Sequence, residues 1–443
     1  MSDQFHLNRY DATAADAWTD REAAHLLNRI QFGFTPAELE RAISDGLEAT
    51  LQRLIEPQPE STEFLRADSE LRQTAISTAN ISDLKIWWLY RMRYSSNPLT
   101  EKMALLWHNH FATSNAKVNS VRHMLAQNDL IRTCATGDFK QLLHGMARDT
   151  AMLIWLDGNA NRKRHPNENF AREIMELFAL GVGNYTERDI QEAARAFTGW
   201  HVRDGGFWLN KLQHDESSKT VFGKTGSYDG NDIVDLCLSQ AACPRFLALK
   251  LARTFVCPEP SAESLDQIAN RIRHYDFQMK PVLKELFTSA WFFQQDHRRA
   301  LIKSPLDLVL GSLRALVEPI RWPGAMKLLA DLGQNVFEPP SVKGWEGGRL
   351  WITSSSLLQR ANFATELTTS QQYGPLSETV RHIEAEPTDR IVAKVEHWLA
   401  TDSMDDSVRQ ELVQFHNQAQ GSQEQRLRGL LQLLLTLPEY QLH

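Results

Sequence analysis

The amino-acid sequence predicts a mainly α-helical protein with several helical lobes packed around a central cleft. Apolar residues recur at steps of three and four along most of the 443-residue chain, which is the spacing of one buried helix face. The 22 glycines and 17 prolines are fewer than the usual ~12% of residues, so few tight turns are expected. The length exceeds the ~250–300 residues at which a single core stops growing, which favours two or three lobes.

Clusters of turn-forming residues divide the helical spacing into segments. Thr35-Pro36 has the threonine cap and first-turn proline of a helix start. Thr186 followed by Asp189 resembles a capping box, and Gly181 suits the end of the preceding helix. We expect helices within residues 21–31, 36–56, 62–94, 98–112, 117–135, 139–156, 167–180, 187–198, 229–256, 261–274, 279–292, 304–319, 323–332 and 388–437.

Residues 201–228 lack the helical period, and their apolar residues are spaced among glycine and aspartate. We expect a small β-hairpin or a long loop there. The lobes are assigned to residues 1–150, to 151–335 with the hairpin as an insertion, and to 336–443.

The composition argues against two classes of partner. The chain has 48 basic and 55 acidic residues, a net charge of −7, whereas a nucleic-acid groove or an anionic membrane surface requires a positive excess. No run of 18 apolar residues is present, so no membrane span is expected. The first residues lack the pattern of a secretory signal, so we expect a cytoplasmic protein. The four cysteines include no Cys-x-x-Cys pair, which favours buried free thiols over a zinc site.

Two histidines stand out in the helix expected over 98–112. On a helical wheel both His108 and His110 are flanked by apolar residues, so both imidazoles are expected to project into protein. They lie on nearly opposite sides and would converge on one ligand only if the helix broke near Asn109. Each is either a hydrogen-bonded core residue or part of a site, since neutral imidazole serves as base or ligand near pH 7.

The segment 152–200 is the densest in polar residues. A loop carries Asp157 and Lys163, and the next expected helix begins after Asn167. The polar side of that helix is an ordinary solvated face in one interpretation and a substrate-binding face in the other. Its members are Glu168, Asn169, Arg172 and Glu176.

Glu173 falls inside the apolar arc of the same helix, between Leu177 and Leu180. A buried carboxylate costs several kcal/mol unless it is paired or protonated. The position therefore predicts a structural ion pair, a metal or a functional carboxylate.

A glycine-rich loop near 339–350 carries Trp345, and Trp351 follows it. Aromatic rings on such a loop can stack on a sugar or another flat ligand. In the alternative interpretation they fill a gap between lobes.

Five runs of sequence carry a resemblance to a known family. They are WHNHFATS (107–114), PNENFAREIMELFALGVGNYTERDIQEAARAFTGW (166–200), HDESSKTVFGKTG (214–226), LIKSPLDLVLGSLRAL (301–316) and FEPPSVKGWEGGRLWI (337–352). Together they resemble the large bacterial family called domain of unknown function 1800, over roughly residues 20–370. That family has no established reaction. Its recurring motifs coincide with His108, Asn109, His110, Asn167, Glu168, Asn169, Arg172, Glu173 and Glu176.

The resemblance also implies a partner, because genes of this family often neighbour those of a second uncharacterised family similar to alkaline phosphatases and sulfatases. This is an association and carries no physical argument.

Two functions fit these residues. The first is an enzyme for hydrolysis or elimination on a carbohydrate-like polar substrate, with Glu173 as general acid or base and a histidine as its proton partner. A metal-assisted form with a divalent ion is an alternative version of it. Its catalytic residues would be His108, His110, Asp157, Asn167 and Glu173. Its substrate-binding residues would be Asn109, Lys163, Glu168, Asn169, Arg172, Glu176, Trp345 and Trp351. The second is a non-catalytic binding or assembly protein, in which the polar network only fixes helix packing.

Overall fold

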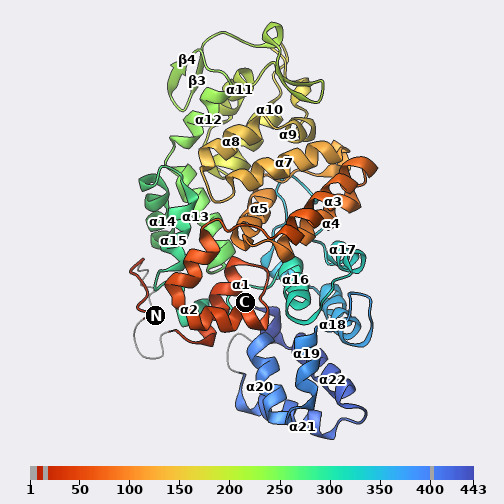
Figure 1. The fold of residues 1–443 in the computed structure, drawn as a ribbon. Coiled ribbons are helices and arrows are strands. Elements are labelled where there is room, and N and C mark those ends of the chain that lie inside the picture. Colours follow the sequence, from red (N-terminus) through yellow and green to blue (C-terminus); the bar gives the residue numbers. More distant parts are fainter. Residues whose placement is uncertain (1–6, 13–17, 400–403) are drawn as a thin grey trace.

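Helices supply nearly all regular structure in the computed structural model, which describes residues 7–12, 18–399 and 404–443 (Figure 1). The mainly α prediction is confirmed. The N-terminal helices are α1 (Asp20–Ile30), α2 (Pro36–Ile55), α3 (Thr62–Thr78), α4 (Ile81–Tyr94), α5 (Pro98–His110), α6 (Asn115–Val118), α7 (Val121–Cys134), α8 (Phe139–Ala147) and α9 (Thr150–Trp155).

The middle of the chain alternates helices with short strands. It contains η1 (Gly158–Ala160), α10 (Glu168–Glu173), the π-helix η2 (Ile174–Leu180), α11 (Glu187–Ala196), β1 (Trp200–Arg203), β2 (Gly206–Leu209), η3 (Lys211–Gln213), β3 (Lys219–Val221) and β4 (Lys224–Gly226). It continues with α12 (Gly230–Leu238), α13 (Ala242–Phe255), α14 (Ala262–His274), α15 (Met279–Phe287), η4 (Gln295–His297), α16 (Pro305–Leu316) and α17 (Trp322–Asp331).

The C-terminal part is again helical. Its elements are η5 (Gly348–Trp351), α18 (Ser354–Thr369), α19 (Glu378–His382), η6 (Ile383–Ala385), α20 (Thr388–Leu399), α21 (Asp406–Gln418), α22 (Gln423–Thr436) and η7 (Pro438–Gln441). Helices α18, α20, α21 and α22 pack on one another.

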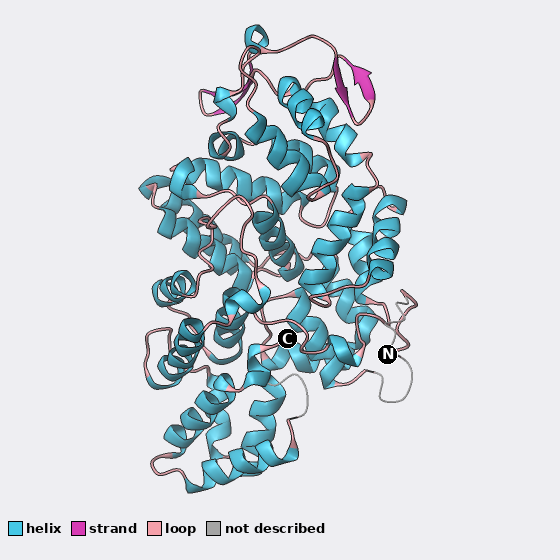
Figure 2. Ribbon diagram, turned by 180° about the vertical axis from the view of Figure 1, so that it is seen from behind, coloured by secondary structure: helices cyan, strands magenta, loops and turns pink. Residues whose placement is uncertain are grey.

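The segment expected to hold a hairpin or a loop contains two antiparallel hairpins. In the first, Trp200 pairs with Leu209, and in the second, Lys219 pairs with Gly226. Figure 2 shows both at one end of an elongated molecule, and α19 to α22 lie at the other end (Figure 1).

The expected 62–94 helix is divided into α3 and α4. Ala79 takes a left-handed conformation (φ 52°), and the Asn80 side chain then accepts a hydrogen bond from Ser82 N–H at 2.9 Å, capping α4. Neither glycine nor proline marks this break, so the spacing of apolar residues did not show it. The caps expected at Thr35 and Thr186 are both present.

The buried apolar side chains form one contiguous cluster from α1 to the last helical turn. Two glycines allow a close approach of two backbone segments: a Cβ on Gly33 (φ +69°) would lie 2.5 Å from the Cα of Gly311 in α16. The four cysteines are buried free thiols, as expected.

Arg29 of α1 is fully buried and joins several distant segments to this core. Its guanidinium donates to the carbonyl oxygens of Phe255, Val256, His297 and His443 at 2.7–3.2 Å. Burial lowers the pKa of Arg29 to about 9. The last residues return to the start of α16, where His443 N–H donates to the Leu301 carbonyl. None of the described helices is long and apolar enough to span a membrane.

Candidate functional site

Three segments far apart in the sequence meet at the C-terminal end of α5. They are His108–His110, the helix pair α10–η2, and the loop of residues 337–352, here called the tryptophan loop. Hydrogen bonds join α5 to Phe337 and Trp345 of the tryptophan loop and to Phe178 of η2. Three of the runs singled out in the sequence are therefore neighbours in space.

His108 holds the start of the tryptophan loop. Its Nε2 accepts a hydrogen bond from Phe337 N–H at 3.2 Å, so the ring proton sits on Nδ1. The ring is buried against Trp88, Phe337 and Trp345, with centroid distances of 5.0–5.8 Å within this group. Burial lowers the pKa of His108 to about 3, so the imidazole is neutral at physiological pH.

His110 holds the end of the π-helix. Its Nε2 lies 2.9 Å from the carbonyl oxygen of Phe178, and because a carbonyl only accepts, this nitrogen carries the proton. Its Nδ1 is buried and, among the described residues, has no hydrogen-bond partner. Burial, with a smaller contribution from Lys250, lowers the pKa of His110 to about 3.

The two imidazoles are thus in opposite tautomers and do not meet. His108 contacts none of the rings that surround His110, which are those of Trp107, Phe111, Phe139, Phe178 and Phe246. Both are buried, as the wheel predicted, but α5 stays regular through Asn109, so nothing brings the two rings to one ligand.

Asn109 holds the middle of the tryptophan loop. Its amide donates to the Trp345 carbonyl at 3.1 Å and accepts from Trp345 N–H at 2.6 Å. The preceding Gly344 has φ +76°, and a Cβ there would overlap the Oδ1 and the main-chain oxygen of Asn109. Only glycine therefore lets the loop approach α5 this closely.

The two tryptophans of the predicted binding loop differ. Trp345 is buried and packs beside His108, so its ring fills space between α5 and the loop. Trp351 is half-buried at the end of η5.

Helix α10 changes into the π-helix η2 directly after Glu173. The Gly181 N–H donates to the Glu176 carbonyl at 2.9 Å, an i to i+5 hydrogen bond. Such π segments are rare and frequently occur at functional sites. Because the wheel assumed 100° per residue throughout, it placed Glu173 wrongly: the side chain is half-buried rather than enclosed by Leu177 and Leu180.

Glu173 lacks the ion-pair partner that burial predicted. Within the described residues its carboxylate has no hydrogen bond and no ion pair. Burial and the neighbouring Glu176 raise the pKa of Glu173, whereas Arg172 and Lys343 oppose the rise. Glu173 is thus a partly desolvated carboxyl group without a structural counterpart.

The residues next to Glu173 have partners of their own. Arg172 donates to Glu187 at 2.6 and 2.9 Å and lies 3.5 Å from Glu168, so Glu187 is its main partner. The Tyr185 hydroxyl donates to Glu176. Burial and this carboxylate raise the pKa of Tyr185 to about 12.

The remaining candidates lie at the start of α10 and away from Glu173. Asn167 caps α10 and donates to the Asp157 carbonyl at 3.2 Å. The Asp157 carboxylate is exposed and forms an ion pair with Lys117. Lys163 and Asn169 are exposed and Glu168 is half-exposed. Asn167 precedes Glu173 by six residues, about 9 Å of helix rise, so the structure does not bring these groups together.

The sequence interpretation missed Lys343. It belongs to the tryptophan loop and acts on the Glu173 carboxylate across the loop–helix contact. Its position just before Gly344-Trp345 was visible in the sequence, but nothing there indicated which helix the loop would face.

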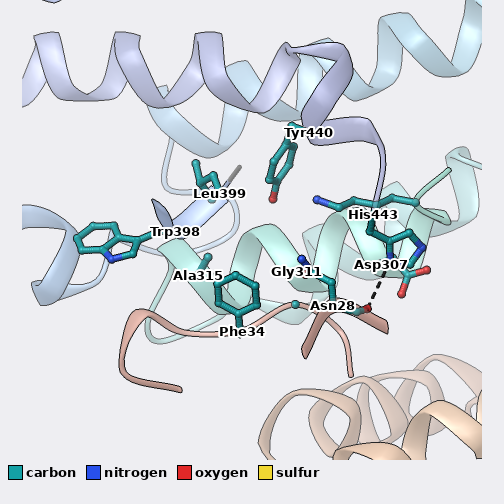
Figure 3. Close-up of a pocket in the computed structure, with 11 residues that line it drawn as sticks. Asn28, Phe34, Asp307, Gly311, Ala315, Trp398, Leu399, Tyr440 and His443 are labelled. Carbon is teal, nitrogen blue, oxygen red and sulfur yellow. Dashed lines mark hydrogen bonds between the residues drawn. The ribbon is translucent and has the colours of Figure 1, made fainter. Parts of the chain in front are cut away.

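It also missed a buried cluster around Lys303. Figure 3 shows the Asp307, Tyr440 and His443 side chains that line the same pocket. The Lys303 Nζ lies 3.7 Å from the Tyr440 ring centroid, and burial lowers the pKa of Lys303 to about 7. Asp307 beside it forms an ion pair with Lys102. The cavity between them, about 20 Å³, has room for about one water molecule, so it is too small for an organic substrate.

Among the described residues, no three His, Cys, Asp or Glu side chains are grouped so that they could hold a metal ion.

Comparison with known proteins gives one match. The family model described as protein of unknown function (DUF1800) matches residues 25–442, nearly the whole chain. No curated protein and no solved structure matches.

Proposed function

We propose that this chain, which belongs to the DUF1800 family of proteins of unknown function, is an enzyme that uses Glu173 as a general acid–base group. Its substrate would be polar and carbohydrate-like, and the reaction a hydrolysis. One observation carries the proposal: Glu173 is a half-buried carboxyl group whose pKa is raised, beside a second carboxylate and without any structural partner among the described residues.

A carboxyl group in such surroundings suits proton transfer near neutral pH. Efficient general acids have a pKa near the working pH, and enzymes raise carboxyl pKa values by partial burial and by a like charge nearby. Both causes act on Glu173, through its burial and through Glu176. An ion pair would instead have lowered the pKa of Glu173.

The His-Asn-His segment supports this centre by positioning it. His108 and Asn109 fix the tryptophan loop at Phe337 and Trp345, on either side of Lys343, and His110 fixes the π-helix that begins after Glu173. These residues are therefore positioning residues in the proposal, and their neutral imidazoles transfer no proton. This differs from the sequence hypothesis, in which a histidine was the proton partner.

The chemistry assigns one role to each group. Protonated Glu173 donates its proton to the leaving oxygen as the bond to it breaks, and a water molecule adds its hydroxyl to the other fragment. The second proton of that water returns to Glu173. Lys343 holds a polar or anionic substituent of the substrate across the centre.

A substrate screen with matched variants tests this function. Wild type would be assayed against a panel of oligosaccharides and polysaccharides beside Glu173→Gln and the control Glu168→Gln on the same helix. We expect hydrolysis by wild type and by Glu168→Gln, and a loss of at least about 100-fold in Glu173→Gln, the scale of general acid–base catalysis. Equal rates in all three would reject Glu173 as the acid.

A second candidate is a non-catalytic assembly protein that binds a partner of the alkaline phosphatase and sulfatase type. Its support is a set of exposed apolar side chains at the end of the tryptophan loop and in α18: Leu350, Leu357 and Leu358 are 60%, 46% and 63% exposed. Co-elution with a purified protein of the alkaline phosphatase and sulfatase type from the same source tests it. We expect complex formation by wild type and none by Leu357→Ser/Leu358→Ser. Separate elution by wild type would exclude this partner.

A further inference from the structure

A second cavity, of about 460 Å³, lies at the other end of α5 from Glu173. Its walls come from the start and end of α2, the junction of α4 and α5, and α16. This volume falls within the range of about 300–1,000 Å³ that small-molecule sites occupy. The 13 residues of α5 separate the cavity from His110 by about 18 Å, so it is distinct from the proposed acid–base centre.

Three arginines line this cavity at different depths. Arg41 is 63% exposed at the rim, Arg53 is 21% exposed, and Arg314 is 5% exposed. The one carboxylate in the lining, Glu38, is fully engaged, because it accepts from the Arg314 guanidinium and from Thr35 N–H at 2.7 Å.

Arg41 and Arg53 are less fully neutralised by carboxylates than Arg314 is. They share a single carboxylate, Asp45, at the long distances of 3.4 and 3.5 Å. Burial and the nearby Arg41 charge lower the pKa of Arg53. Two neighbouring guanidinium groups that share one carboxylate leave a net positive charge, which favours binding of an added anion.

Two side chains of the lining contain buried nitrogen atoms with weak pairing or none. The Nε of Arg53 lacks a hydrogen-bond partner among the described residues, and the Nη2 of Arg53 has only the 3.5 Å ion-pair contact with Asp45. The amide nitrogen of Gln31, a side chain that is only 2% exposed, also lacks a partner among the described residues. These N–H groups are enclosed by protein, so they favour negative charge in the cavity without contacting a ligand directly.

Two helix starts add to the preference for negative charge. Ala37 and Pro98, at the first turns of α2 and α5, both line the cavity. The N-terminal end of a helix carries a partial positive charge and N–H groups without intrahelical partners.

From this geometry we propose that the cavity binds a small organic ligand through a phosphate or sulfate ester group. The guanidinium groups of Arg41 and Arg53 supply donors to the ester oxygens, and the remaining volume holds the organic part. A lone inorganic ion would fill only a small part of the space. Ser96 in the wall offers its hydroxyl group to a polar, sugar-like portion, whereas the Ser95 hydroxyl already donates to Glu60 at 2.5 Å.

Isothermal titration of the full chain with four probes tests this inference. The probes are glucose 6-phosphate, glucose 6-sulfate, inorganic phosphate and uncharged glucose. The variants are Arg53→Gln, Arg53→Lys, which keeps the charge but loses the fork, and the control Arg245→Gln, which removes an exposed arginine paired with Asp266 far from the cavity. Circular dichroism verifies that each variant is folded.

We expect saturable binding of at least one ester and none of glucose. Affinity should fall at least tenfold in Arg53→Gln, fall less in Arg53→Lys and stay unchanged in Arg245→Gln. The tighter ester identifies the source as a phosphorylated or a sulfated compound. Unaltered binding by Glu173→Gln would separate this site from the acid–base centre. The inference is overturned if neither ester nor inorganic phosphate binds saturably, or if Arg53→Gln binds as wild type does.

Discussion

The side-chain amide of Asn109 forms two hydrogen bonds with the main chain of a single distant residue, Trp345. The amide nitrogen donates to the Trp345 carbonyl at 3.1 Å, and the amide oxygen accepts from the Trp345 N–H at 2.6 Å. With the His108–Phe337 hydrogen bond, this pairing fixes the tryptophan loop to α5 on both sides of Lys343. The position of Lys343, and with it the surroundings of Glu173, therefore depends on α5.

Replacing Asn109 or Gly344 should release the loop. Asn109→Ala should cost about 1–3 kcal/mol, because it removes two hydrogen bonds to a partly buried backbone. Gly344→Ala should cost at least as much, since its Cβ overlaps both the side chain and the main-chain oxygen of Asn109. The double variant Asn109→Ala/Gly344→Ala should not regain stability, because the Cβ at position 344 still overlaps the main-chain oxygen of residue 109. Urea unfolding and amide exchange at Trp345 measure these effects; recovery of stability in the double variant would contradict this geometry.

Glu173→Gln should leave the free energy of unfolding at pH 7 unchanged or slightly raised. The carboxylate has no partner to lose, and the amide is easier to desolvate. The matched control is Glu101→Gln in α5. Glu101 is fully buried and accepts from Arg91 at 2.9 Å, from Arg132 at 2.8 and 3.1 Å and from Trp88 at 3.0 Å.

Breaking that buried group of charges should cost about 3–5 kcal/mol. Urea denaturation of both variants measures the contrast. A comparable loss in Glu173→Gln would show that Glu173 has a structural partner and would weaken its catalytic assignment.

Acid should destabilise the protein through His108 and His110. In the folded state both have a pKa of about 3, against about 6.5 when unfolded. The unfolded chain therefore binds more protons between these values, so their contribution to stability is complete above pH 6.5 and declines as the pH falls toward 3. Each histidine should remove about 1.4 kcal/mol per pH unit in this window.

Urea unfolding between pH 7 and pH 5 measures how steeply the free energy of unfolding depends on pH. In His110→Phe this dependence should be weaker by the contribution of one histidine. Proton resonances of the two imidazoles should not titrate over the same range. A titration midpoint near pH 6.5 for either ring would contradict its enclosure.

Arg29→Met should cause one of the largest losses of stability in the molecule. The fully buried guanidinium of Arg29 donates to four main-chain carbonyls from three separate segments. Removing it leaves these acceptors unpaired at about 1–3 kcal/mol each, a sum that relaxation of the chain and entry of water will reduce. Arg29→Lys should recover only part of the loss, because an ammonium group lacks the planar fork. Thermal unfolding of both variants provides the measurement, and a Met variant as stable as wild type would refute the role of Arg29.

The sequence by itself determined the helical class, the caps at Thr35 and Thr186, the non-helical segment over 201–228, the enclosure of His108 and His110, and the family. These properties follow from local rules: three-to-four spacing, caps such as Thr35 and Thr186, and turn-forming residues act within a few positions of the chain. The break between α3 and α4 at Ala79 was not predicted, because neither glycine nor proline marks it in the sequence.

Only the tertiary structure decided what the conspicuous residues do. It made Asn109 and the two histidines anchors for other segments, switched α10 to a π-helix after Glu173, and brought Lys343 toward that carboxylate. It also formed the arginine-lined cavity from residues 31–59, 95–98 and 314. Such contacts join positions that are 68 to 236 residues apart or more, and their geometry depends on how helices pack, which periodicity within one helix does not encode.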